Sequence, residues 1–254
     1  MPSEKQPAPF GDHNHHYAAH SLPGNRKQSE EERKLEALLA DFDPKLEERV
    51  SRTIRQWNNI LRDYLRTEMA FRLTVGDDSE SIPMKIVPGL PRPLAAIIQP
   101  LDTTTLRLML NLPLLNTTAD GLAFLARHSP EPDTTQLAAA ERIVRAHLQQ
   151  LQRIELQKQL AAIHQDILGA YFFRVPAIQI YWMAIGLISR TLNIDPEALT
   201  TVVLLHELAH AYSHRGRDID ANRWDVNAFA SADIHIVEGI AQYYTETICK
   251  KNEG

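Results

Sequence analysis

The segment His206-Glu207-Leu208-Ala209-His210 constrains this chain more than any other feature of its sequence. On a helix, two histidines four residues apart differ by about 40° around the axis, so both imidazoles leave the same face and can bind one metal ion. Glu207 points to a neighbouring face, where it can accept a proton from a water molecule that the metal activates. The pentad therefore predicts a metal-binding helix with Glu207 as a general base.

The residues before the pentad favour a helix. Asp195 is suited to an N-cap, Pro196 to the first helical position, and Glu197 places an acid in the first turn. Apolar residues then follow at helical spacing, namely Leu199, Val202 and Val203. Gly216 is a stop signal after the pentad. We therefore expect the pentad to lie inside a long helix.

A catalytic zinc site normally has three protein ligands and one open position, so a third ligand is needed. A second segment, residues 235–244, reads His-Ile-Val-Glu-Gly-Ile-Ala-Gln-Tyr-Tyr. Its Glu-Gly-Ile-Ala run, followed by tyrosine, resembles the Asn-Glu-Gly-Phe-Ala helix of aminopeptidase-type gluzincins, in which the glutamate is the third zinc ligand. The resemblance covers about residues 200–250. It implies that His206, His210 and Glu238 hold Zn²⁺.

The spacing of these residues separates the site from other zincin patterns. The metzincin pattern requires a glycine three residues after the second histidine and another histidine three residues further on. Those positions hold Ser213 and Gly216, which excludes that class. Between His210 and Glu238 lie 27 residues, more than is usual in the aminopeptidase and thermolysin families. An inserted loop over residues 215–231 would account for the excess.

The resemblance implies a zinc-dependent metallopeptidase that hydrolyses peptide bonds in a peptide or protein substrate. Glu207 would take a proton from the attacking water and pass it to the leaving amine. His235, Tyr243 and Tyr244 are candidates for stabilising the transition state. His214, one turn past the pentad, is expected at the surface or behind the metal ligands. Rival carboxylates for the third ligand position are Asp218, Asp220, Asp225 and Asp233.

Three other interpretations start from the same residues. A di-iron carboxylate bundle uses a Glu-x-x-His motif, which Glu207 and His210 satisfy, but the sequence contains no second motif of this kind. A zincin-like protein can also retain its metal while its protease activity is restricted to one partner or lost. The third interpretation is a helical interaction module that docks through predicted helices at residues 43–74 and 133–168.

Composition narrows the range of partners. The net charge of −5 and the pI near 6.1 give no electrostatic argument for binding nucleic acid. Cys249 is the only cysteine, which excludes an intramolecular disulfide and suits a reducing compartment. The first 30 residues have no apolar signal-peptide region, and the longest apolar stretch, residues 175–189, is too short to span a bilayer. We expect a cytoplasmic protein that binds neither nucleic acid nor membrane; its oligomeric state stays open.

We expect a helix-rich α+β fold with a zincin-like catalytic core and a long-helix N-terminal region. Three parts are predicted from composition and periodicity: a disordered tail over residues 1–29, a mainly helical region over residues 30–170, and the metal-binding core over residues 171–254. The tail contains several histidines, at positions 13, 15, 16 and 20, which we attribute to low complexity.

Local patterns predict the individual elements. Asp43-Pro44 predicts the start of a long amphipathic helix, and prolines between Ser81 and Leu114 predict irregular or extended chain. Within that region, leucines alternate over residues 106–112, which is typical of a strand. Helices are expected over residues 118–128 and 133–168.

The segment just before the predicted metal helix alternates in the same way. Ile178 and Ile180 flank Gln179, which predicts a strand over residues 177–181, and residues 181–192 have the pattern of a helix. In zincins, a strand at the sheet edge binds the extended backbone of the substrate by strand addition. We expect residues 177–181 to be that edge strand.

Overall fold

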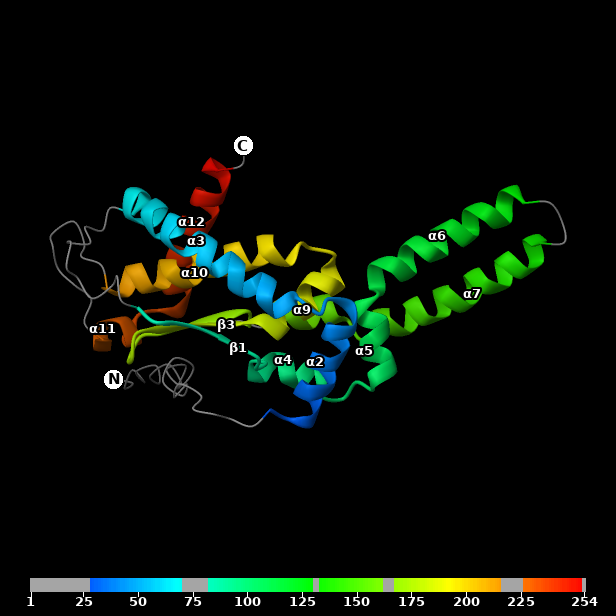
Figure 1. The fold of residues 1–254 in the computed structure, drawn as a ribbon, viewed down its shortest axis with the longest axis horizontal. Helices are drawn as coiled ribbons and strands as arrows, with labels where there is room; N and C mark the ends of the chain where they lie inside the picture. The colour runs from blue at the N-terminus through cyan, green and yellow to red at the C-terminus, as the bar shows by residue number, and fades with distance from the viewer. Residues whose placement is uncertain (1–27, 70–81, 130–132, 162–166, 216–225, 253–254) are drawn as a thin grey trace, which may run out of the picture.

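The computed structural model describes residues 28–69, 82–129, 133–161, 167–215 and 226–252. It combines many helices with one small sheet, which confirms the helix-rich α+β class (Figure 1). The helices are α2 (Glu30–Phe42), α3 (Leu46–Glu68), α4 (Arg92–Ile98), α5 (Thr103–Leu110), α6 (Leu112–His128), α7 (Asp133–Gln152), α8 (Leu156–Ala161), α9 (Trp182–Leu192), α10 (Pro196–Arg215), α11 (Val226–Ser231) and α12 (Ile234–Lys251). The strands are β1 (Met84–Val87), β2 (Gly169–Phe172) and β3 (Ala177–Tyr181).

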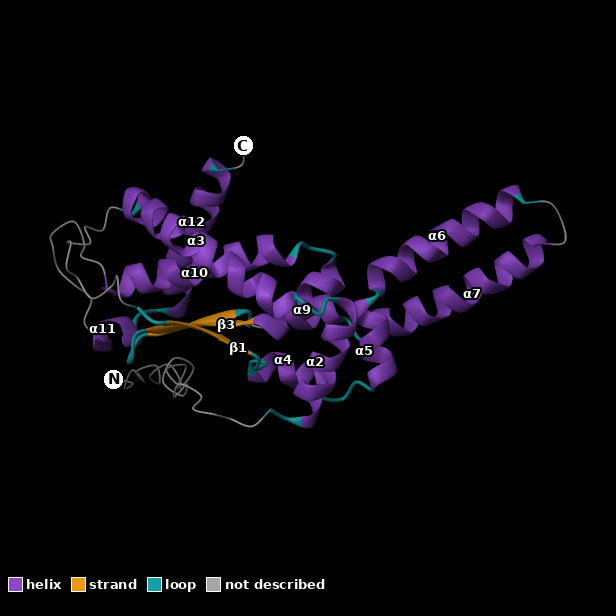
Figure 2. Ribbon diagram, in the orientation of Figure 1, coloured by secondary structure: helices purple, strands orange, loops and turns teal. Residues whose placement is uncertain are grey.

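The sheet has the order β1-β3-β2, with β1 parallel and β2 antiparallel to β3 (Figure 2). The strand predicted over residues 177–181 is confirmed as β3. The expectation that it forms the sheet edge is wrong, because β3 is the central strand. Its first four residues are all buried, as is typical of a strand covered on both faces. The edge strand that lies against α10 is β2.

Helix α10 is the central element of the fold, packed against α3, α12 and the sheet. Its predicted N-cap is confirmed, because Asp195 Oδ2 accepts a hydrogen bond from the Ala198 backbone N–H at 2.8 Å. Leu204, Leu205 and Leu208 are fully buried in the main hydrophobic core. Each such side chain contributes roughly 1.5–3 kcal/mol of hydrophobic stabilisation, so the core fixes the rotation of α10 about its axis.

The main core draws residues from both the region before β2 and the region after it. Leu35 on α2, Val50 and Leu65 on α3, and Ile98 on α4 belong to the same buried cluster as the apolar side of α10. Ile248 on α12 belongs to this cluster as well. The predicted N-terminal region and the predicted metal-binding core therefore pack around one hydrophobic core.

The strand predicted from the alternating leucines at residues 106–112 is wrong, because this segment forms α5 and the start of α6. Asp102 caps α5 by accepting a hydrogen bond from the Thr105 backbone N–H at 2.8 Å. Leu106 and Leu110 are then one helical turn apart, and both are buried. The Asp102 cap and the buried Leu106–Leu110 pair favour a helix, and together they outweigh the alternating pattern that favours a strand.

The long helix predicted over residues 133–168 is interrupted between α7 and α8. Glu155, just before α8, adopts a left-handed conformation with φ of 48°. In a continuous helix, Leu151 and Leu156 would be about 140° apart. The interruption lets both pack with Met109 in a second buried cluster. The predicted start of the helix after Asp43 is also wrong by two residues, since α3 begins at Leu46.

Helices α6 and α7 form an antiparallel hairpin that projects away from the rest of the molecule (Figure 1). The predicted helix over residues 118–128 is confirmed as the C-terminal part of α6. Of the tail predicted over residues 1–29, residues 1–27 lie outside the described residues. Ser29, at its end, is the N-cap of α2. In the described part of the chain, no helix has both the length and the apolar character needed to cross a membrane.

Candidate metal centre

Two turns of α10 place the pentad histidines side by side. The rings of His206 and His210 are perpendicular, with their centroids 4.6 Å apart. Their Nε2 atoms are 3.1 Å apart, so both nitrogens face the same point. His210 is 2 % exposed and His206 is 17 % exposed, so solvent reaches the pair from the His206 side.

The carboxylate of Glu238 completes the group from α12, which packs against α10. Its Oε2 atom lies 3.3 Å from His206 Nε2 and 3.5 Å from His210 Nε2. Asp233 caps α12 by accepting a hydrogen bond from the His235 backbone N–H at 2.8 Å. Val237 and Ala241 are buried in the main core. The burial of these two neighbours sets the rotation of α12 that turns Glu238 toward the histidines.

The three ligand atoms fit a tetrahedral metal ion. Zinc bonds to histidine nitrogen and carboxylate oxygen are about 2.0–2.2 Å long, so two ligand atoms of a tetrahedron lie roughly 3.3–3.5 Å apart. The observed separations of 3.1, 3.3 and 3.5 Å among His206, His210 and Glu238 form a triangle of that size. Two imidazoles and one carboxylate are a donor set that zinc accepts in catalytic sites.

Glu207 is the residue of the pentad that the sequence predicts as a general base. It leaves α10 next to both histidines and is 1 % exposed. The backbone of β2 passes directly over its carboxylate: a Cβ atom on Gly169 would meet Glu207 Oε1 at 2.7 Å and Cγ at 2.8 Å. Glycine at this position therefore allows β2 to approach Glu207 closely.

The outer edge of β2 presents backbone groups beside Glu207. The Tyr181 backbone N–H donates to the Leu168 carbonyl at 2.9 Å in the ladder between β2 and β3. Because bonded and non-bonded pairs alternate in an antiparallel ladder, Ala170 turns its N–H and C=O toward β3, whereas Gly169 and Tyr171 turn theirs to the outer edge. Both residues are buried, so these backbone groups are not open to solvent.

A buried hydrogen bond joins β2 to α10. The Tyr171 hydroxyl and His214 Nδ1 are 2.8 Å apart, and both side chains are buried. Phe173 and Phe229 pack around the imidazole, with ring centroids 6.1 and 4.7 Å from it. Burial lowers the pKa of His214 to about 4, with a further decrease from the charge of Arg215. Burial also raises the pKa of Tyr171, so a neutral phenol and a neutral imidazole face each other.

His214 is therefore a buried side chain and not a surface one. It does not belong to the group of metal-binding atoms, which consists of His206, His210 and Glu238 within the described residues. Of the rival carboxylates, Asp233 is the N-cap of α12. The other three, Asp218, Asp220 and Asp225, lie outside the described residues.

The structure does not bring the predicted auxiliary residues into this group. His235 is exposed, and its backbone N–H rather than its ring makes the contact with Asp233. Tyr243 is 63 % exposed, and its ring packs against Tyr244. On α12, Tyr243 is five residues past Glu238 and therefore about 140° away around the axis. Tyr244 is partly buried and packs against the main core.

Sequence reasoning missed the contribution of β2 to the site. Gly169 follows directly on the helix predicted over residues 133–168, and neither it nor Tyr171 has a role in the sequence analysis. Both precede the pentad by more than 30 residues, so no local spacing connects them with it. A glycine beside a run of aromatic residues, here Tyr171 to Phe173, can indicate a close backbone approach within a strand, which was the available signal.

Comparisons of the chain with protein-family profiles, with curated proteins and with solved structures gave no match.

Proposed function

We propose that this protein is a zinc-dependent metallopeptidase of the gluzincin type, with a zincin-like core around α10, α12 and the sheet. The observation that carries the proposal is the triangle formed by His206 Nε2, His210 Nε2 and Glu238 Oε2, with sides of 3.1, 3.3 and 3.5 Å. The ligands come from two helices, with 27 residues between His210 and Glu238, and independent helix packing would not be expected to bring them to metal-ligand distances.

His206, His210 and Glu238 would hold Zn²⁺, which polarises the scissile carbonyl and makes a water molecule acidic. Glu207 accepts the proton of that water as the water attacks the carbonyl carbon, and then transfers the proton to the leaving amine. Burial of Glu207 against β2 restricts its carboxylate to a small volume. The restricted position reduces the reorganisation that proton transfer requires.

The hydrogen bond between Tyr171 and His214 holds β2 at a fixed position on α10. It thereby keeps Gly169 against the carboxylate of Glu207.

Metal analysis and a base-deleted variant test the proposal. Protein purified without a histidine tag should carry about one zinc per chain. Glu207→Gln should keep this zinc and should lose hydrolysis of a peptide library by a factor on the order of 10² or more. Glu246→Gln, at an exposed site on α12, is the matched control and should keep both properties.

The outcomes separate the alternatives. Absence of zinc after addition of excess Zn²⁺ would overturn the metal centre itself. Stoichiometric zinc without hydrolysis of any library member would replace the peptidase with a zincin-like protein whose activity is restricted to one partner or lost. Loss of zinc in Glu207→Gln would make Glu207 a ligand rather than a base.

A further inference from the structure

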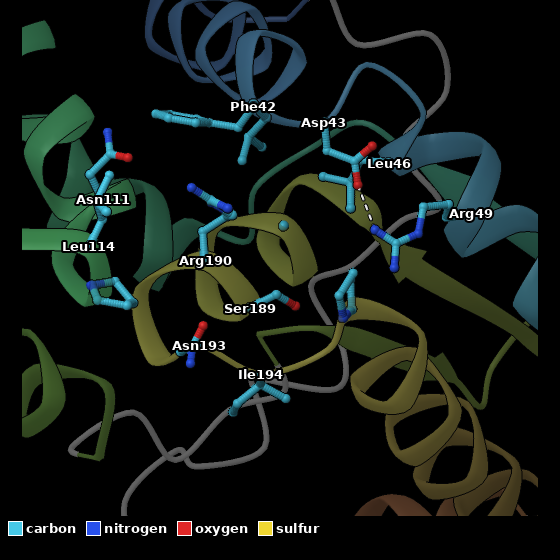
Figure 3. A pocket seen from close by; sticks show the side chains of 14 residues that line it. Phe42, Asp43, Leu46, Arg49, Asn111, Leu114, Ser189, Arg190, Asn193 and Ile194 are labelled. Carbon is cyan, nitrogen blue, oxygen red and sulfur yellow. Dashed lines mark hydrogen bonds and ion pairs between the residues drawn. The ribbon is translucent and has the colours of Figure 1, made fainter. Parts of the chain in front are cut away.

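A cavity of about 520 Å³ lies where the α6–α7 hairpin joins the rest of the molecule (Figure 3). Its walls come from the end of α2, the start of α3, the start of α6, the end of α9 and the segment that leads into α10. Pro196 in its wall is ten residues before His206 on α10, a rise of about 15 Å along the axis. The cavity is therefore separate from the candidate metal centre.

One of the two arginines in the wall is fully engaged in ion pairs. Arg49 contacts Asp43 at 2.7 Å, Glu197 at 3.0 Å and Asp195 at 3.2 Å. Its hydrogen bonds to Glu197 and Asp43 raise the pKa of the guanidinium further. Arg49 consequently has little remaining capacity for an anionic ligand, and its role is to join α3 to the start of α10.

The second arginine has a different environment. Arg190 lies at the mouth of the cavity, and its guanidinium is stacked on the Phe42 ring at 4.7 Å from the centroid. It forms no ion pair with any carboxylate in the described residues. The neighbouring Ser189 is 4 % exposed, and its hydroxyl has no hydrogen-bond partner among those residues. Figure 3 shows both side chains on the α9 side of the cavity. Stacking on Phe42 holds the cation in place and leaves its donors available.

The rest of the wall combines apolar and polar side chains. Leu114 and Ile194 are its exposed apolar residues, and Asn111 and Asn193 contribute amides. A cavity of this volume falls within the range of small-molecule sites. Asp43 also lines the cavity, but its carboxylate pairs with Arg49, which leaves Arg190 as the charged wall residue without an ion pair among the described residues.

We propose that this cavity binds a small organic carboxylate with an apolar body. The carboxylate pairs with the guanidinium of Arg190, and the apolar body packs against Leu114 and Ile194, the exposed apolar residues of the wall. A guanidinium binds a planar carboxylate through two parallel hydrogen bonds, which gives both affinity and orientation. The proposal does not depend on the peptidase function, because the cavity shares no residue with the metal centre.

Calorimetric titration of the full-length protein with 4-phenylbutanoate, and with 4-phenylbutan-1-ol as its uncharged analogue, tests the proposal. We expect saturable binding of the acid at one site and an affinity for the alcohol about tenfold lower, as for the loss of one charge-assisted contact. Arg190→Gln should remove the difference between the two probes. Arg127→Gln, which removes an exposed arginine near the tip of α6, should preserve it.

A second pair of variants tests the apolar part of the site. Leu114 is 63 % exposed at the mouth, so Leu114→Trp should obstruct entry without disturbing the core, and it should weaken binding of both probes. Leu125→Trp, further along the same helix, should leave binding unchanged. The acid must also bind to Glu238→Ala, in which the proposed zinc site is weakened. This result distinguishes binding in the cavity from binding of the acid's carboxylate to zinc. The proposal is overturned if the acid shows no saturable binding, if Arg190→Gln and Leu114→Trp both bind like the wild type, or if binding is lost in Glu238→Ala.

Discussion

In the proposed metal centre the carboxylate of Glu238 is the ligand on α12, and its removal would leave the two histidines of α10. We predict that Glu238→Ala lowers zinc affinity by at least about 10–100-fold, the loss typical of weaker perturbations around a metal. Competition with a chromophoric chelator measures the change. Asp233→Asn, which keeps the N-cap of α12, should bind zinc like the wild type. Loss of zinc in Asp233→Asn with retention in Glu238→Ala would contradict the ligand assignment.

Gly169 determines how closely β2 approaches Glu207. A Cβ atom at residue 169 would lie 2.7–3.0 Å from three atoms of the Glu207 side chain, so Gly169→Ala must displace the carboxylate. We predict that this variant keeps its zinc and loses peptide hydrolysis by a factor on the order of 10 to 10², because the base is displaced relative to the substrate. Zinc content and hydrolysis rate are measured on the same preparation.

The control for this prediction is the next residue along β2. Ala170 pairs with Gln179 and turns its side chain to the opposite face of the sheet. Ala170→Ser should therefore retain hydrolysis. Equal activity of Gly169→Ala and the wild type would show that the close approach of β2 does not matter for the reaction.

At the scale of elements, the hydrogen bond between Tyr171 and His214 makes the packing of β2 on α10 sensitive to acid. In the folded protein the pKa of His214 is lowered to about 4, mainly by burial, whereas in the unfolded chain it is near 6.5. Between these two pH values, the unfolded chain binds a proton at residue 214 that the folded protein does not. The neutral, buried His214 therefore contributes to the free energy of unfolding in full above about pH 6.5. This contribution is lost as the pH falls toward 4.

We predict a loss on the order of 1–2 kcal/mol in the free energy of unfolding from this residue between pH 7 and pH 4.5, after allowance for solvent screening. Urea unfolding of metal-free protein at the two pH values measures it. His214→Gln, which does not titrate, should show a correspondingly smaller pH dependence. An identical pH dependence in the wild type and in His214→Gln would rule out His214 as the source.

At the scale of the whole molecule, a metal ion bound by α10 and α12 would stabilise the fold through mass action, because the unfolded chain does not hold the three ligands together. A free zinc concentration 100 times the Kd corresponds to about 2.7 kcal/mol, or a Tm increase of roughly 5–10 °C for a chain of this size. We predict that a chelator lowers the Tm of the wild type by an amount in this range. The Tm of Glu238→Ala should change very little, and equal shifts in the two proteins would contradict a shared metal site.

Local sequence patterns were sufficient to predict the helix that carries the pentad and the strand at residues 177–181. The Asp195 cap, the proline after it and the i, i+4 spacing of His206 and His210 act through contacts within one or two turns. Such contacts depend only on neighbouring residues, so they can be identified in the sequence. The same reasoning failed at residues 106–112, where a cap at Asp102 and a buried leucine pair outweighed an alternating pattern.

The sequence by itself thus determined the helix-rich class, the histidine face of α10 and the identity of Glu238 as a candidate ligand. Only the tertiary structure decided that Glu238 Oε2 lies within 3.5 Å of both histidines, that the edge strand beside Glu207 is β2 rather than β3, and that the place of a Cβ atom on residue 169 is taken by Glu207. The physical reason is the range of the interactions. Helix caps and i, i+4 pairs form between near neighbours, whereas these contacts join segments tens of residues apart and depend on how the whole core packs.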